Sequence, residues 1–98
     1  MSAAGREFDP VATALSAIEN ASAIPISKDE LARLLRTGKG EPSHLRALFS
    51  DVDLYTLLRL ASRFDIDSEM LARAYRRARR DSAAANPELE EFAAQFDA

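Results

Sequence analysis

Apolar residues recur along this chain at spacings of three and four positions, which is the period of an α-helix that buries one face. No stretch alternates apolar and polar residues as a strand would, and β-branched residues are scarce beside Ala, Leu, Arg and Glu. Pro and Gly are few and fall between the periodic stretches. The pattern therefore predicts an all-α fold, a compact bundle of five or six short helices.

Capping residues indicate where the first helices begin and end. Asp9 followed by Pro10 predicts a helix that reaches about residue 23. Ser27 and Glu30 form an S-x-x-E capping box for a second helix. Gly38 and Gly40 should end it, because glycine adopts the left-handed cap conformation without strain.

The remaining helices are predicted from the same signals. A short helix covers about 42–49, and Ser50 or Asp51 caps the next one, over about 52–64. That fourth helix is apolar on more than one stripe, which predicts that it lies at the centre of the bundle. Asp67 or Ser68 caps a fifth helix that reaches about residue 82, and a last helix starts near Asn86, Pro87 and Glu88.

Length and composition narrow the possible functions. The 98 residues make one domain and include no cysteine and one histidine, which excludes disulfides, thiolate metal sites and a multi-histidine zinc site. We expect a non-enzymatic protein without metal or cofactor. The chain shows no signal-peptide pattern and no apolar run of about 20 residues, so a cytoplasmic protein without a membrane span is expected. The predicted parts are a flexible N-terminus (1–7), a helical domain (8–82) and an acidic C-terminal helix (83–98).

Charge is distributed unevenly. The formal net charge is −3, yet residues 51–80 carry seven basic and five acidic residues, whereas residues 81–98 carry five acidic residues and no basic one. A basic segment followed by an acidic tail can interact with a partner or with itself.

The stretch from Ser27 to Leu71 resembles the lambda-repressor-like (Xre/Cro-type) helix-turn-helix domain over about half the chain. ISKDELARLL is similar to the second helix of that family, and TLLRLASRFDIDSEML to its fourth helix and following turn. PSHLRALFS then occupies the place of the recognition helix. The turn at Gly38–Gly40 is longer than the tight turn of the family, and the polar face of PSHLRALFS is small.

The resemblance implies a DNA-binding site. In such domains the recognition helix enters the major groove, so Ser43, His44 and Arg46 would lie near bases and Lys39 would meet phosphate. The alternative is that these helices simply form a bundle. For His44, the alternative is an exposed or helix-N-terminal histidine without a chemical role.

Four arginines form a second candidate site. Arg73, Arg76, Arg77 and Arg80 are spaced to lie on one side of the fifth helix, where they could bind phosphates or an acidic partner surface. Two alternatives make this face self-paired: Glu69 lies four residues before Arg73, and the acidic tail with Glu88, Glu90 and Glu91 could fold back onto it.

The C-terminal helix is the third candidate. Leu89, Phe92 and Phe96 form an apolar edge that could dock on a partner or on a second copy. Docking on its own domain is the favoured alternative, because exposed phenylalanines are a liability.

The sequence thus predicts a small non-catalytic DNA-binding or transcription-associated regulator that acts as a dimer. The alternative function is a helical protein-interaction module, such as an adaptor, an antitoxin-like partner or an assembly subunit. It would act through the arginine face or the C-terminal helix.

Overall fold

The computed structural model describes residues 8–96, and the predicted flexible segment 1–7 lies outside them, as do residues 97 and 98. Over this range the chain is all-α, as predicted. Its helices are α1 (Pro10–Ser22), α2 (Lys28–Thr37), α3 (Pro42–Asp51), α4 (Leu54–Arg63), α5 (Ser68–Ser82) and α6 (Pro87–Ala94).

Side-chain caps explain most of the helix starts. The Asp9 carboxylate accepts hydrogen bonds from the backbone N–H groups of Val11 and Ala12, and the Ser27 hydroxyl accepts one from Glu30. Only this half of the predicted capping box forms, because the Glu30 carboxylate pairs with Arg33 instead, at 2.8 Å. At the start of α5, the Asp67 carboxylate accepts a hydrogen bond from the backbone N–H of Met70 and so caps the helix.

The predicted cap of α4 is wrong. α3 continues to Asp51, so neither Ser50 nor Asp51 can start the next helix. The cap is Asp53, whose carboxylate accepts from the Thr56 hydroxyl at 2.6 Å and from the Thr56 N–H at 3.3 Å. These bonds stabilise the ionised form and lower the pKa of Asp53.

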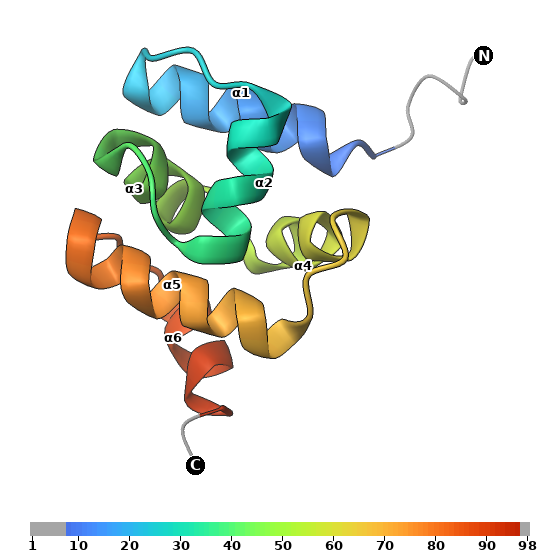
Figure 1. The fold of residues 1–98 in the computed structure, drawn as a ribbon, viewed down its shortest axis with the longest axis vertical. Helices are drawn as coiled ribbons and strands as arrows, with labels where there is room; N and C mark the ends of the chain where they lie inside the picture. Colours follow the sequence, from blue (N-terminus) through green and yellow to red (C-terminus); the bar gives the residue numbers. More distant parts are fainter. Residues whose placement is uncertain (1–7, 97–98) are drawn as a thin grey trace.

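The prediction that α4 lies at the centre of the bundle is wrong, because its main packing partners are only α1 and α5. α5 packs against α2, α3, α4 and α6, whereas α3 packs between α1 and α5. Figure 1 shows α1 and α5 on opposite sides of the molecule, with α2, α3 and α4 between them and α6 below α5. The buried side of α5 combines three alanines, beside which neighbouring helices can approach closely, with two larger side chains: Leu71, Ala72, Ala74, Tyr75 and Ala78.

α4 has more apolar surface than the fold covers. It buries Leu57, Leu60 and Ala61, but Tyr55 is 59% exposed and Leu58 36% exposed. The Phe8 ring, 43% exposed, lies 5.6 Å from the Tyr55 ring. The wide apolar face of α4 was the reason for predicting a central helix, but part of that face is exposed, and a helix with a wide apolar face can be peripheral.

Candidate functional site

A groove between α2 and α5 is formed by an unusually close contact of two backbones. Gly38 ends α2 in the left-handed conformation, with φ of +70°. A Cβ at this position would lie 2.3 Å from the carbonyl oxygen of Ala74. A groove of about 330 Å³ lies next to this contact, lined by residues of α2, its C-terminal turn and α5, Ala74 among them.

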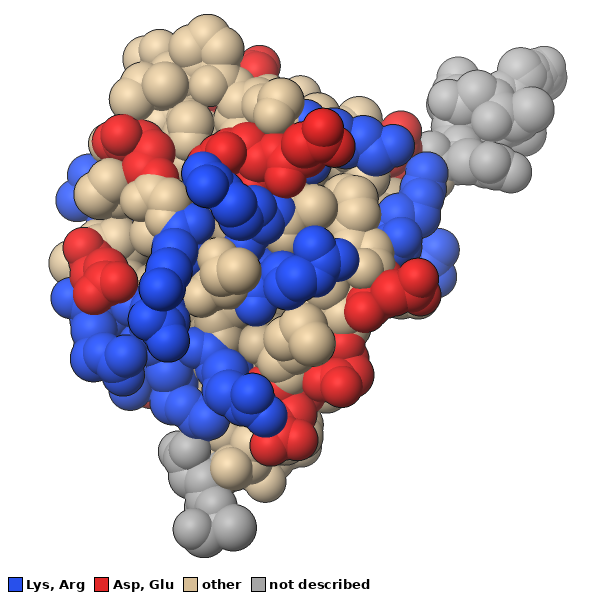
Figure 2. Space-filling model, viewed as in Figure 1, with Lys and Arg blue, Asp and Glu red and all other residues tan. Residues whose placement is uncertain are grey.

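The groove, which we call the basic groove, has cationic walls and a partly apolar floor. The half-buried Met70 contributes to the floor, and no carboxylate lines the groove among the described residues. Figure 2 shows Lys and Arg side chains gathered over α5 and the end of α2. The lining residues are Arg36, Thr37 and Lys39 from α2 and its C-terminal turn, and Met70, Arg73, Ala74 and Arg77 from α5.

Two of the four cations are held in place. The Arg36 guanidinium donates to the carbonyl oxygen of Phe64 at 3.0 Å. Arg73 pairs with Glu69 at 3.2 Å, as predicted from their spacing, and both side chains are about 60% exposed or more. Such an exposed pair contributes little free energy, so a ligand carboxylate or phosphate can replace Glu69 at small cost.

The other two cations of the groove have no ion-pair partner in the described part of the chain. Neither Lys39 nor Arg77 forms an ion pair there.

The turn that carries Lys39 is ordered by side-chain hydrogen bonds. The Thr37 hydroxyl donates to the Arg33 carbonyl oxygen at 2.8 Å and accepts from the Lys39 N–H at 3.1 Å. The backbone at Lys39 is therefore fixed relative to α2, while its ammonium group stays exposed.

The predicted arginine face of α5 is divided between two neighbours. Arg73 and Arg77 line the basic groove, and Arg80 is exposed one turn further along α5. Arg76 instead turns toward α6, where its guanidinium donates to the carbonyl oxygen of Ala93 at 3.2 Å. The acidic tail does fold back onto α5, but Glu90 pairs at 2.6 Å with Arg79, which is not one of the four arginines of the predicted face.

Glu90 also accepts a hydrogen bond from the Tyr75 hydroxyl, at 2.6 Å. Burial, and then this bond, raise the pKa of Tyr75 to about 12. The Tyr75 hydroxyl and the Arg79 guanidinium lower the pKa of Glu90. These polar contacts fasten α6 to α5 beside the buried Leu89.

The C-terminal helix is part of the domain core. Leu89 is fully buried and Ala93 nearly so, while Phe92 and Phe96 are half-buried and stack edge to face at 5.5 Å. The prediction of a partner or dimer helix is wrong for Leu89, whose side chain is not accessible. The favoured alternative, docking of this helix on its own domain, is confirmed.

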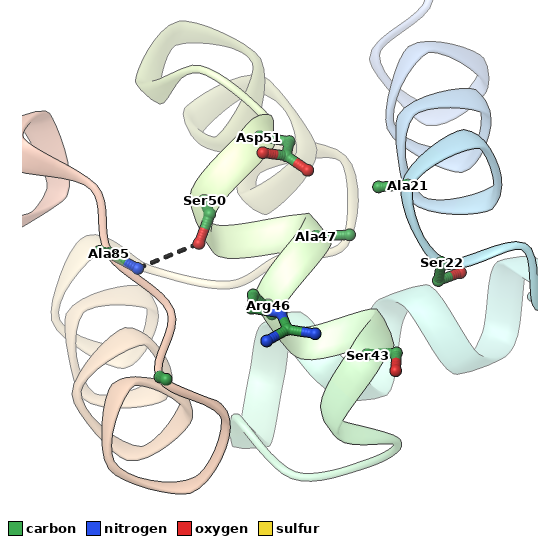
Figure 3. A pocket seen from close by; sticks show the side chains of 9 residues that line it. Ala21, Ser22, Ser43, Arg46, Ala47, Ser50, Asp51 and Ala85 are labelled. Carbon is green, nitrogen blue, oxygen red and sulfur yellow. Dashed lines mark hydrogen bonds between the residues drawn. The ribbon is translucent and has the colours of Figure 1, made fainter.

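The four predicted DNA-binding residues do not meet at one site. Lys39 lines the basic groove, whereas Ser43 and Arg46 line a second groove, of about 570 Å³, along the outer side of α3. Figure 3 shows Ser43, Arg46 and Ser50 on α3, with Ser22 at the end of α1 on one side and Ala85 on the other. The Ala85 N–H donates to the Ser50 hydroxyl at 3.0 Å, so the segment before α6 is tied to α3.

His44, one of the predicted DNA contacts, is buried in the structure. Its side chain is 5% exposed, and Nε2 lies 3.1 Å from the carbonyl oxygen of Ile24. The side chain is therefore not accessible to a base, and of the alternative, an exposed or helix-N-terminal histidine, only the second half is confirmed, because His44 lies in the first turn of α3. The residue belongs to the buried side of α3 because Leu45, Leu48 and Phe49 fix that side inward.

The position of α3 bears on the helix-turn-helix resemblance. α2 and α3 each pack against α5 rather than mainly against each other, and five of the ten residues of α3 are buried. Its outer side forms the floor of the second groove, between Ala21 and Ser22 of α1 and the segment at Ala83 and Ala85. A helix at the floor of a groove has less access to a DNA major groove than a protruding one.

Sequence reasoning missed the residues that complete the basic groove. Arg36 and Met70 come from two helices that are 30 residues apart, and no spacing rule relates them. One signal was present: Arg36 lies in the last turn of α2, beside the Gly38–Gly40 turn that also carries Lys39.

Comparisons with known proteins give no relative. No family model, no curated protein and no solved structure matches this chain. Within residues 8–96 no helix is long and apolar enough to cross a membrane. No group of three or more His, Cys, Asp or Glu side chains in the described region could hold a metal ion.

Proposed function

We propose that this protein is a non-catalytic helical interaction module that binds a negatively charged macromolecule in the basic groove. One observation carries the proposal: four cations, from α2, its C-terminal turn and α5, line a groove that no described carboxylate lines. A chain with a net charge of −3 has no general affinity for polyanions, so such a local collection of cations marks a particular surface.

A binding experiment with charge reversal tests the proposal. Binding of duplex DNA and of poly-glutamate is measured by fluorescence anisotropy at low and moderate salt. The test variant is Arg73→Glu with Arg77→Glu. The matched control is Arg59→Glu with Arg63→Glu, which makes the same charge change at the same spacing on α4, outside the groove.

We expect the unmodified protein to bind at least one of the two polyanions at low salt, with affinity that falls as salt is added. The groove variant should bind at least about tenfold more weakly, and the α4 variant within about twofold of the unmodified protein. Absence of binding to both polyanions at low salt would overturn the proposal, as would an equal loss in the α4 variant.

A DNA-binding regulator that uses α3 is the second candidate. Arg46 favours it, because this side chain is exposed beside Ser43 and forms no ion pair with any described residue. This candidate predicts that Arg46→Ala weakens DNA binding more than Arg77→Ala does. The opposite order would exclude α3 as the main contact.

A further inference from the structure

We infer that the ligand of the basic groove is an acidic amphipathic peptide segment of a partner protein, in which an apolar side chain sits between two rows of carboxylates. The inference rests on the proposed function and adds the chemistry of the partner. It follows from the floor of the groove, the spacing of its cations and the way its walls are fixed.

The floor is the first argument. Met70 is half-buried and lines the groove together with the cations of α2, its C-terminal turn and α5. A phosphodiester chain gains little from an apolar surface at this place, since its outer face is charged. An aliphatic side chain does gain, because it removes apolar surface from water, and a methionine adapts its shape to such a neighbour.

The spacing of the cations is the second argument. Arg73 and Arg77 are four residues apart on one helix, which places their Cβ atoms about 6 Å apart. Carboxylates at positions i and i+4 of a peptide helix have the same separation, so one row of carboxylates can meet both arginines. Arg36 and Lys39 stand on the opposite wall and can meet a second row.

The rigidity of the walls is the third argument. The Gly38–Ala74 contact fixes the distance between α2 and α5, the Phe64 carbonyl oxygen holds Arg36, and Thr37 orders the turn before Lys39. Binding to a groove whose backbone walls and Arg36 side chain are already placed loses less conformational entropy. The two walls therefore suit a ligand of defined width, such as one helix, better than a flexible polyanion.

Three probes test the inference on the full chain. The first is a labelled peptide of about 18 residues, long enough to be partly helical, with Glu at i, i+4 positions on both sides of a Leu stripe. The second is the same peptide with its Leu residues replaced by Ser, and the third is a duplex DNA of similar charge. Each is titrated against the unmodified protein and against Met70→Gln, with thermal unfolding measured to compare the folds.

We expect the Leu peptide to bind at least about tenfold more tightly than the Ser peptide and than the duplex. Met70→Gln should remove most of the preference for Leu over Ser while Glu-dependent binding persists. The Leu and Ser peptides can be compared on the unmodified protein, so the inference remains testable if the variant does not fold.

Two other outcomes overturn the inference and can be told apart. Equal binding of both peptides and the duplex, abolished by charge reversal at Arg73 and Arg77, would mean that the groove recognises charge alone; the proposed function would then stand. Failure of all three probes to bind at low salt would overturn the inference and the proposed function together.

Discussion

The two sides of α5 carry the same residue type and use it in different ways. On the side facing α6, Arg76 and Arg79 contact a backbone carbonyl oxygen and the Glu90 carboxylate. On the side facing α2, Arg73 and Arg77 line a groove with Arg36 and Lys39. The first side is a packed seam between helices, and the second is an open surface.

What separates the two sides is the residue opposite each arginine. α6 begins with acidic residues and buries Leu89, so it brings both a carboxylate and an apolar anchor to α5. The end of α2 brings two cations and a glycine, and both cations line the groove beside the backbone contact at Gly38. An arginine stripe is therefore structural or available for binding according to its neighbours in space, which its own spacing does not reveal.

The seam can be broken most strongly at Leu89. Leu89→Ala removes a fully buried side chain between α6 and α5, and we expect it to lower the free energy of unfolding by about 2–5 kcal/mol. Urea denaturation followed by circular dichroism measures the change. A loss below about 1 kcal/mol would contradict the assignment of α6 to the core. Ala94→Ser, an exposed change on the same helix, is the control.

The groove can be broken at Gly38. Gly38→Ala places a Cβ against the Ala74 carbonyl oxygen in a left-handed backbone conformation, and we expect a loss of about 2–3 kcal/mol. Gly38→Asn separates the backbone strain from the steric clash, because asparagine tolerates the left-handed conformation but its Cβ still meets the Ala74 carbonyl oxygen. If both variants are as stable as the unmodified protein in urea denaturation, the close contact of α2 and α5 is wrong.

Tyr75 tests the polar part of the seam. Tyr75→Phe removes the bond to Glu90 and leaves the N–H of Asn86 without its Tyr75 partner, which lies at 3.3 Å. We expect a loss of about 1–2 kcal/mol at neutral pH in thermal or urea unfolding. An unchanged stability would show that these bonds are replaced by water without cost.

The same hydroxyl predicts a dependence on alkaline pH. The pKa of Tyr75 is about 12 in the folded protein and near its ordinary value of 10 in the unfolded chain. The folded state holds this proton more tightly, so its contribution is fully present below pH 10 and is lost as the pH rises to about 12. Over this window the unmodified protein should lose stability relative to Tyr75→Phe, and parallel stability curves for the two proteins would contradict the assignment.

The smallest expected changes in stability come from substituting one arginine on each side of α5. Arg79→Gln removes the exposed pair with Glu90 and should cost up to about 1 kcal/mol, whereas Arg77→Gln should change stability by no more than about 0.5 kcal/mol. Urea denaturation at low salt gives the largest difference, because salt screens the pair. A larger cost for Arg77→Gln would reverse the assignment of the two sides.

The amino-acid sequence alone determined the local structure. Periodic apolar residues predicted the helices, and Asp9, Ser27, Asp67 and Asn86 marked helix starts because capping is a contact between near neighbours in the chain. The fold-back of the acidic tail was also foreseeable, since the chain has acidic and basic segments close together. The choice between Asp51 and Asp53 as the cap of α4 was not, because it depended on how far α3 extends.

Only the tertiary structure decided which apolar and charged faces meet. It packed α5, rather than α4, against four other helices, buried His44 and Leu89, and divided the arginines between α6 and the basic groove. The physical reason is that helix faces are set by local periodicity, while their partners are set by packing between residues far apart in sequence. Gly38 against Ala74 and Arg36 near Met70 are contacts of that second kind.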